Sequence, residues 1–551
     1  MAEPSVGELL TQPGSISEID VLVSKSAHRQ CLDILMSNYP KESALVRTLE
    51  LNLTQWKLQS ATTNVDRQQK TLSIVLVYTN GSQAVYKEHF TGHSFGCTMA
   101  DPKYNGIMTA AQSAIDGLNY DSAPDFVSAL PQRDLASFEA YSQAVCDPKY
   151  NNSRAFLIYQ KGKLVWEKYC TPGKDKDTKL TLKDFGGYSF ATIWPMARNL
   201  EGKLDLDQLS HCPELKQLEK RARNMTARNL MSYRIGRPLE VPPAKATKPK
   251  NLYDTEKMLY VVADMANYAA VVPSSYGAGT VPLEWSRSHY TTPGSSVLLQ
   301  RELRYTFPAS SQGFSEYAAY PWTRVFSQLG ARSFTMEADA SGTFVGIHGL
   351  YANARDFLRL GVLIAQQGKW YGKQILPAEY THRNLNSPFG TDQRFGEGWW
   401  SFKYGNDVPK LLYLVGGHGA IYIIPELEIV IFDAQNSHNA KRTNEKIFEH
   451  MQAFLKKQTA AWITTTTSTT TTPGSTSRTA ATAITATLLP AVTSPVGAGI
   501  STSVAMSLAT SVAPTTTVAI EDFLGFASRS SLKQWILFAL MLVLDVAVQN
   551  A

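Results

Sequence analysis

The sequence predicts a mixed α/β (α+β) fold built from antiparallel strand pairs and amphipathic helices. Two strand–turn–strand patterns carry this prediction, one at residues 154–169 and the other at 411–432. Helical patterns lie between them, including a buried run at 192–200 that ends before Gly202, where a helix C-cap is expected. Pro195 either kinks this helix or marks its first turn.

The composition is that of a globular protein with long tails. The chain has a net charge of +6, with 44% hydrophobic and 18% charged residues. Its length of 551 residues is enough for two or more domains. The basic residues form no dense run, so nucleic acid is not an expected partner. No cysteine pair has Cys-x-x-Cys spacing, so we expect no metal and no cofactor, and the odd count leaves a thiol unpaired. The cysteines are Cys31, Cys97, Cys146, Cys170 and Cys212.

Residues 1–130 are predicted to form an N-terminal α+β region. An amphipathic run predicts a helix near 18–37. Two β-rich runs flank Asn80-Gly81 and predict a hairpin at 71–90, and a further helix is expected near 107–118. This region contains no recognisable catalytic constellation, so it is either a small separate domain or an elaboration of the main one.

Residues 131–457 resemble the serine β-lactamase and penicillin-binding-protein superfamily, in particular the branch with esterases and 6-aminohexanoate-dimer hydrolase. Several ordered blocks carry the resemblance: EGKLDLD after the buried helix, MTARNLMSY at 225–233, and GLYANARDF with GKWYG and ILP within 342–380. The resemblance implies a β-lactamase/transpeptidase-like fold, with an antiparallel sheet flanked by helices and an all-α lobe. Within these blocks Arg355 and Asp356 are expected to tie a helix to neighbouring backbone, and Trp370 is expected to pack.

The family's reactive pair, Ser-x-x-Lys, is missing from the expected place. Counting back from Glu201 without gaps puts Phe185 at the nucleophile position and Tyr188 at the lysine position. Phenylalanine cannot attack a carbonyl, and a tyrosine with an ordinary pKa is a weak base at neutral pH. Ser189 is the nearest substitute nucleophile, but Thr192 stands where its lysine is needed.

Two further family elements are partly preserved. Tyr290 matches the tyrosine that helps to move the proton in relatives, although the accompanying asparagine is not evident; alternatively it is a packed tyrosine. His418 lies in a glycine-rich segment that resembles the family's substrate-facing strand, and alternatively it fills the old pocket. In that segment Gly417, Gly419 and Ala420 are small enough for a backbone N–H to serve as an oxyanion donor.

The C-terminal composition indicates a surface protein. Residues 458–525 are rich in Thr and Ser and are expected to form an O-glycosylated stalk or a linker. Residues 526–551 contain a short apolar run that suits a glycolipid-anchor signal or a hydrophobic tail anchor. No N-terminal signal peptide is recognisable, which leaves a cytosolic location as the alternative to a membrane-associated one at the cell surface. Asn-x-Ser/Thr sequons occur at Asn52, Asn80, Asn151 and Asn224 and favour a secreted glycoprotein.

Three functional hypotheses follow. The favoured one is a catalytically degenerate, membrane-tethered relative that binds a small molecule or peptide in the old cleft. The second is an active ester or amide hydrolase that works by acyl transfer, with Ser189 aided by Tyr290 and His418. The third is a structural surface glycoprotein. Loss of Ser-x-x-Lys favours the non-catalytic reading, because acyl transfer needs both groups.

Overall fold

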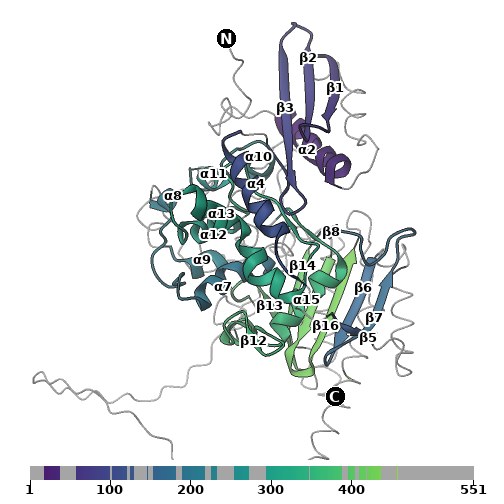
Figure 1. Cartoon of the computed structure of the whole chain (residues 1–551), viewed down its shortest axis with the longest axis vertical. Coiled ribbons are helices and arrows are strands. Elements are labelled where there is room, and N and C mark those ends of the chain that lie inside the picture. Colours follow the sequence, from purple (N-terminus) through teal and green to yellow (C-terminus); the bar gives the residue numbers. More distant parts are fainter. Residues whose placement is uncertain are drawn as a thin grey trace, which may run out of the picture.

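A computed structural model describes most of the chain between residues 18 and 435 (Figure 1). The described residues are 18–36, 57–99, 102–120, 125–128, 146, 153–181, 189–216, 225–232, 254–271, 293–346, 348–386, 395–403, 409–416, 419–435 and 456.

The N-terminal residues form a helix packed on a four-stranded antiparallel sheet of order β1-β2-β3-β4. Its elements are α2 (Glu18–Cys31), the π-helical turn η1 (Leu32–Met36), β1 (Leu58–Asp66), β2 (Thr71–Tyr78), β3 (Gln83–Gly92) and β4 (Gly96–Met99). Alternate residues of β2, Leu72, Ile74 and Leu76, are fully buried, as expected for a sheet with one face covered. A disulfide between Cys31 and Cys97 joins the end of α2 to β4. The predicted first helix and the hairpin at 71–90 are confirmed.

The larger body is organised around a seven-stranded sheet of order β13-β14-β15-β16-β6-β7-β5. The strands are β5 (Val127–Ser128), β6 (Ser153–Gln160), β7 (Lys163–Tyr169), β13 (Trp400–Lys403), β14 (Lys410–Gly416), β15 (Gly419–Ile424) and β16 (Ile429–Gln435). Neighbours pair antiparallel, except that β5 runs parallel to β7. Both predicted strand pairs are confirmed, and β16 pairs with β6, so segments far apart in the sequence meet in the middle of the sheet.

Helix α15 (Ala354–Ala365) packs directly on β6, β15 and β16. The Asn353 side chain caps its start by accepting the N–H of Asp356 at 2.8 Å. Close approach to the sheet depends on Gly361, because a Cβ there would lie 2.6 Å from Ile421 Cδ1 and 2.7 Å from Val430 Cγ1. The packing of helix on sheet therefore requires a residue without a side chain at this position.

A helical lobe lies beside the sheet (Figure 1). Its elements are α4 (Pro102–Asp116), α7 (Ile193–Leu200), α8 (Pro213–Lys216), α9 (Ala227–Met231), α10 (Asp254–Tyr260), α11 (Met265–Val271), α12 (Pro293–Tyr305), α13 (Ser311–Pro321), the π-helical turn η4 (Trp322–Phe326), α14 (Ser327–Leu329) and α16 (Glu379–Leu385). Small strand groups connect the parts: β8 (Leu180–Thr181), β10 (Leu350–Ala352) and β9 (Thr335–Met336) form one sheet, and β11 (Lys369–Trp370) pairs with β12 (Lys373–Gln374).

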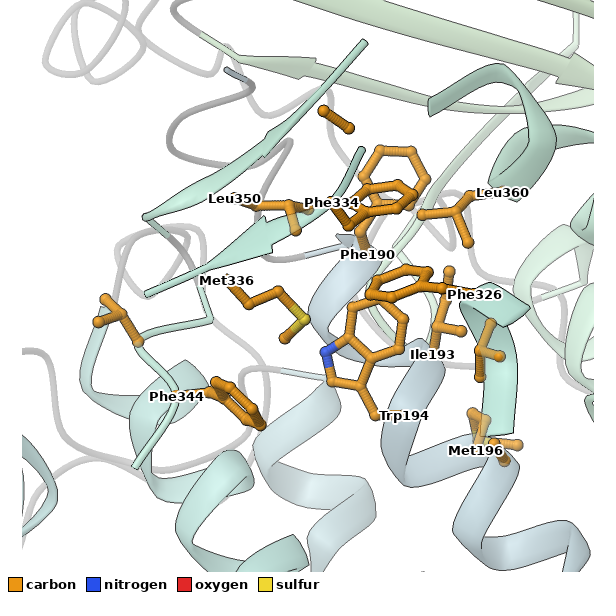
Figure 2. Close-up of a cluster of buried hydrophobic side chains, with 14 of the residues drawn as sticks. Phe190, Ile193, Trp194, Met196, Phe326, Phe334, Met336, Phe344, Leu350 and Leu360 are labelled. Carbon is orange, nitrogen blue, oxygen red and sulfur yellow. The ribbon is translucent and has the colours of Figure 1, made fainter. Parts of the chain in front are cut away.

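The core of this lobe is aromatic (Figure 2). Trp194 of α7 is fully buried, and its ring meets that of Phe326 edge-on at 5.0 Å between centroids. Phe326 in turn stacks on Phe334 at 4.0 Å. Such contacts add to the stabilisation from apolar burial. They fix α7, the helix predicted from the sequence, against its neighbours.

Arg355 and Asp356 were expected to tie α15 to neighbouring backbone, and Asp356 does so. Asp356 accepts from the Ser333 backbone N–H at 2.8 Å, which confirms its role. Arg355 instead binds a side chain, with its Nε and Nη2 at 2.8 and 2.6 Å from the two carboxylate oxygens of Glu167. A guanidinium fork matches a carboxylate better than a single carbonyl, so the expectation of a backbone contact is wrong. Trp370 is buried and packs edge-on against Phe126, as predicted.

Packing links part of the predicted N-terminal region to the larger body. Met108, Ala111 and Ile115 of α4 belong to the main hydrophobic core, and α4 packs on α13. Strand β5 pairs with β7 of the large sheet. The segment 458–525 and the C-terminal segment 526–551 lie outside the described residues, and within the described part of the chain no helix combines the length and apolarity needed to cross a membrane.

Candidate functional site

Helix α7 is the buried helix that the sequence predicted at residues 192–200. Thr192 is its N-cap residue, and Pro195 falls in the first turn, where the missing N–H costs no hydrogen bond. The helix ends at the C-cap residue Glu201, followed by Gly202 with a φ of +66°. The position of Pro195 resolves the alternative left by the sequence, and the predicted stop at Gly202 is confirmed.

Ser189 precedes this helix and is buried, with 2% of its surface exposed. Its Oγ donates to the carbonyl oxygen of Gly398 at 2.5 Å. A serine that attacks a carbonyl must pass its proton to a base. Within the described part of the chain, the partner of the Ser189 hydroxyl is a backbone carbonyl, which accepts a hydrogen bond but does not take the proton. The observed role of this hydroxyl is therefore to join the start of the helix to the segment before β13.

Thr192, three residues after Ser189, is part of the same buried polar cluster. Its Oγ1 donates to the Ser189 carbonyl at 2.7 Å and lies 2.5 Å from the hydroxyl of Tyr380. The indole Nε1 of Trp399 donates to the same tyrosine hydroxyl at 2.9 Å. The Tyr380 hydroxyl also donates to the carbonyl oxygen of Glu397 at 3.3 Å. Burial raises the pKa of Tyr380, so this phenol stays protonated at neutral pH.

The segment that carries Gly398 is held by buried charges. Glu397 is 1% exposed and contacts both Arg228 and Arg383, the latter through Nε at 3.1 Å to each carboxylate oxygen. Arg228 also forms an ion pair with Asp207, whose pKa is lowered mainly by hydrogen bonding to this guanidinium. A buried carboxylate is stable only when paired in this way. Arg228 was recognised within a sequence block, but nothing in the sequence pattern pointed to Glu397.

The family resemblance at 225–233 has a structural explanation. Thr226 is the N-cap of α9, and its Oγ1 accepts the Asn229 N–H at 3.2 Å. The Asn229 side chain accepts the Thr226 N–H at 2.9 Å, completing a capping box. Asn229 therefore takes the second position of the capping box at the start of α9.

The remaining predicted site residues divide between described and undescribed parts of the chain. Gly419 and Ala420 begin β15, where Gly419 pairs with Gly416 of β14 and Ala420 is fully buried. Gly417 and His418 fall between these strands and lie outside the described residues, so their placement and their oxyanion or binding roles stay predictions. Phe185, Tyr188 and Tyr290 also lie outside the described residues.

Sequence reasoning did not find three residues of this cluster. The Tyr380 hydroxyl contacts Thr192 and accepts from Trp399, and the Gly398 carbonyl accepts the hydrogen bond of Ser189. Gly398 has a φ of +97°, and a Cβ there would lie 2.6 Å from Thr192 Cγ2. No local signal identifies them, because Tyr380 lies 188 residues from Thr192 and Gly398 lies 209 residues from Ser189 in the chain. Across the described residues, no group of three or more His, Cys, Asp or Glu side chains is arranged to hold a metal ion.

Comparisons with known proteins agree with this architecture. Residues 189–452 match the sequence model of a family described as "Beta-lactamase". No curated protein matches the sequence. Among solved structures, the chain is similar to a putative 6-aminohexanoate-dimer hydrolase from Bacillus anthracis, at 20% identity and a TM-score of 0.47, with 63% of this chain and 90% of the other covered.

Two other solved structures are similar at lower identity. A putative beta-lactamase from Bacteroides dorei has 14% identity and a TM-score of 0.41, with 59% of this chain and 99% of the other covered. The hydrolase EstCE1, described as having promiscuous acyltransferase activity, has 14% identity and a TM-score of 0.41, with coverages of 58% and 97%. Residues 189–452 therefore match the β-lactamase family, and the chain has a β-lactamase/transpeptidase-like fold over this part.

Proposed function

We propose that this protein is a catalytically degenerate member of the superfamily, tethered to a membrane, which uses the cleft of the β-lactamase-like domain to bind a small molecule or peptide. The observation that carries the proposal is the state of Ser189, which is buried and donates its hydroxyl proton to the Gly398 carbonyl. The position three residues later holds Thr192, which has no amine to act as a base.

The sequence at the expected reactive positions supports the same proposal. Phe185 and Tyr188 occupy the nucleophile and lysine positions in the ungapped count from Glu201. The match to the family begins at residue 189, after both positions. Among the described residues, the buried cluster around Thr192 and Tyr380 satisfies polar groups without directing a base at a hydroxyl. Such a cluster preserves the fold while supplying no nucleophile.

The location at a cell surface has its own support. The disulfides Cys31–Cys97 and Cys146–Cys170 are of the kind that persists in oxidising compartments. The sequon residue Asn80 lies in the exposed turn between β2 and β3, where a glycan would meet no packed neighbour. The composition of the Thr/Ser-rich segment 458–525 is typical of a stalk, and that of the apolar run within 526–551 is typical of a membrane anchor or its signal.

The experiment that tests degeneracy is intact-mass analysis of the purified full chain after incubation with a fluorophosphonate and, separately, with benzylpenicillin. We expect no mass increase from protein whose cooperative thermal unfolding shows that it is folded. A stoichiometric adduct that maps to one serine and disappears when that serine is replaced by alanine would refute degeneracy and establish an acyl-transfer hydrolase. The Ser189→Ala chain is the first such comparison.

A second experiment tests the membrane tether independently. The full-length gene is expressed in cultured eukaryotic cells, and intact cells are treated with a phosphatidylinositol-specific phospholipase C. Release of the protein into the medium supports a glycolipid anchor. Retention at the surface indicates a tail anchor, and recovery in the cytosolic fraction without glycans contradicts both the tether and the surface location.

A further inference from the structure

The hairpin formed by β2 and β3 has one covered face and one open face. The covered face packs on α2 and buries Leu72, Ile74 and Leu76. On the open face, Val75 of β2 pairs with Val85 of β3, and Val85 is 39% exposed. Solvated sheet faces normally carry polar side chains. The part of the open face nearer the turn is therefore an apolar surface in contact with water.

The same hairpin has no charge of its own. From Thr71 to Tyr86 the sequence contains no Asp, Glu, Lys or Arg, and strand β2 reads TLSIVLVY. Uncharged segments of high β-propensity without proline are the ones through which chains associate. Strands β1 and β3 pair with both edges of β2, so its open face is the surface through which a second chain would associate.

Natural sequences protect such strands with charged residues at their flanks. Lys70 occupies this position before β2. The flank after β2 is the turn at residues 79–82, which is uncharged and reads Thr-Asn-Gly-Ser. The turn lies at the end of the hairpin that points away from the larger body (Figure 1). Any protection at this end must come from something other than a charged side chain of the turn.

The turn contains an Asn-x-Ser sequon, and its geometry leaves the Asn80 side-chain nitrogen available. Asn80 and Ser82 are both exposed. The Ser82 N–H and Oγ–H donate to Asn80 Oδ1 at 3.0 and 2.7 Å. Among the described residues, no group accepts a hydrogen bond from the Asn80 amide nitrogen. A Cβ added at Gly81 would meet no atom within 4 Å, so the surroundings of the turn are open.

We propose that Asn80 carries an N-linked oligosaccharide, which covers the open face of the β2–β3 hairpin and prevents chains from associating through it. In the modification, the Asn80 side-chain nitrogen loses a proton and bonds to the anomeric carbon of an oligosaccharide carried on a lipid pyrophosphate. The bond between that carbon and the pyrophosphate breaks, and the lipid pyrophosphate leaves. The inference rests on the surface location in the proposed function, because this acceptor motif is used in secreted proteins.

The apolar positions lie within reach of a glycan at the turn. Val77 and Val75 precede Asn80 by three and five residues, and both face the open side of β2. These separations correspond to about 10 and 16 Å along a strand. An N-linked oligosaccharide is bulky and solubilising. Attached to Asn80, it supplies at the second flank of β2 the protection that Lys70 supplies at the first.

The occupancy of the site is measured first. The full chain is expressed in cultured eukaryotic cells, and its peptides are treated with peptide-N-glycosidase in water labelled with oxygen-18, which marks each asparagine that carried a glycan. We expect the mark at Asn80. An unmarked Asn80 beside a marked Asn52, Asn151 or Asn224 overturns this inference and leaves the surface location standing. The absence of a mark from all four overturns the inference together with that location.

The protective role is measured as the aggregated fraction in size-exclusion chromatography after prolonged incubation at pH 7. We expect Asn80→Gln to raise this fraction about threefold or more. Asn64→Gln, the same change at an exposed position of β1 outside any sequon, should leave it unchanged. Adding Val85→Lys to Asn80→Gln should restore the original fraction, because a charge then interrupts the apolar face. Equal aggregation of Asn80→Gln and the unmodified chain, or no rescue by Val85→Lys, overturns the protective role.

Trimming the glycan on the folded protein keeps the test valid if Asn80→Gln fails to fold. The other three sequons are first removed by substitution with glutamine, so that an endoglycosidase acts on Asn80 alone. Trimming should raise the aggregated fraction to the same extent as Asn80→Gln. An unchanged fraction after complete trimming overturns the protective role.

Discussion

Replacing Tyr380 by phenylalanine tests whether the polar cluster beneath α7 is a structural one. Tyr380 is 1% exposed. The hydroxyl that the substitution removes accepts a hydrogen bond from Trp399 Nε1 at 2.9 Å and lies 2.5 Å from Thr192 Oγ1. Thr192 keeps its donation to the Ser189 carbonyl at 2.7 Å. The indole N–H is the group left without a partner, because the ring around it is fully buried.

The magnitude follows from that one orphaned donor. Leaving a buried donor unsatisfied costs about 1–3 kcal/mol. In a body of this size each kcal/mol lowers Tm by ~2–4 °C, so we expect a fall of several degrees. Differential scanning calorimetry and chemical denaturation measure it. Tyr371→Phe is the matched control, since Tyr371 is 62% exposed and its hydroxyl should contribute little.

Coupling between the two partners sharpens the test. A double-mutant cycle of Tyr380→Phe with Trp399→Phe should give an interaction free energy of ~0.5–3 kcal/mol, because the second substitution removes the orphaned donor. An unchanged Tm in Tyr380→Phe would refute the structural account of the cluster. A loss of ester hydrolysis without a loss of stability would instead indicate a catalytic phenol.

Three further outcomes are expected from other parts of the fold. Gly361→Val should destabilise the body by about 1–3 kcal/mol, seen as a lower denaturation midpoint, because its Cβ would start 2.6 Å from Ile421 Cδ1; an unchanged midpoint would contradict the close packing of α15. Replacing Cys31 and Cys97 together by serine should cost ~2–5 kcal/mol and speed proteolysis of the N-terminal unit, and equal proteolysis rates would argue against a stabilising disulfide. The pKa of His28 is raised well above 6.5 by the carboxylates of Glu337 and Glu88 on either side, against the effect of burial. The contribution of the His28 ion pairs to the free energy of unfolding is therefore complete below about pH 6.5 and is lost as the pH rises through the folded pKa. In His28→Gln, the free energy of unfolding should no longer fall over this alkaline range. If the free energies of unfolding of the two proteins instead change in parallel with pH, the ion pairs are refuted.

The elements with local signals were predictable from the sequence. The turn at Asn80-Gly81, the stop at Gly202 and the strand pair at 154–169 depend on nearby residues, and the structure confirms each. Thr226 and Arg228 lie in the block at 225–233 that carries the resemblance, and in the structure they cap α9 and pair with Asp207, respectively. Local patterns and ordered family blocks were sufficient to predict the fold class, because each consists of residues that are neighbours in the sequence.

The polar cluster was not predictable, because its members come from distant segments. Ser189 meets Gly398, and Thr192 meets Tyr380, only after the helical lobe has packed on the sheet. Periodicity identifies the buried face of a helix but not the partner that a buried hydroxyl finds there. Arg355 illustrates the limit, because its helix was predicted correctly while its partner depends on β7.

Turnover of a nitrophenyl ester by the folded full chain tests catalytic degeneracy most directly. The comparison is between the unmodified chain, the Ser189→Ala chain and buffer alone, with thermal unfolding used to show that both proteins are folded. The account predicts that the two proteins have the same rate, no faster than buffer. Saturable turnover by the unmodified chain that falls at least a hundredfold in Ser189→Ala would contradict the account and identify Ser189 as a nucleophile.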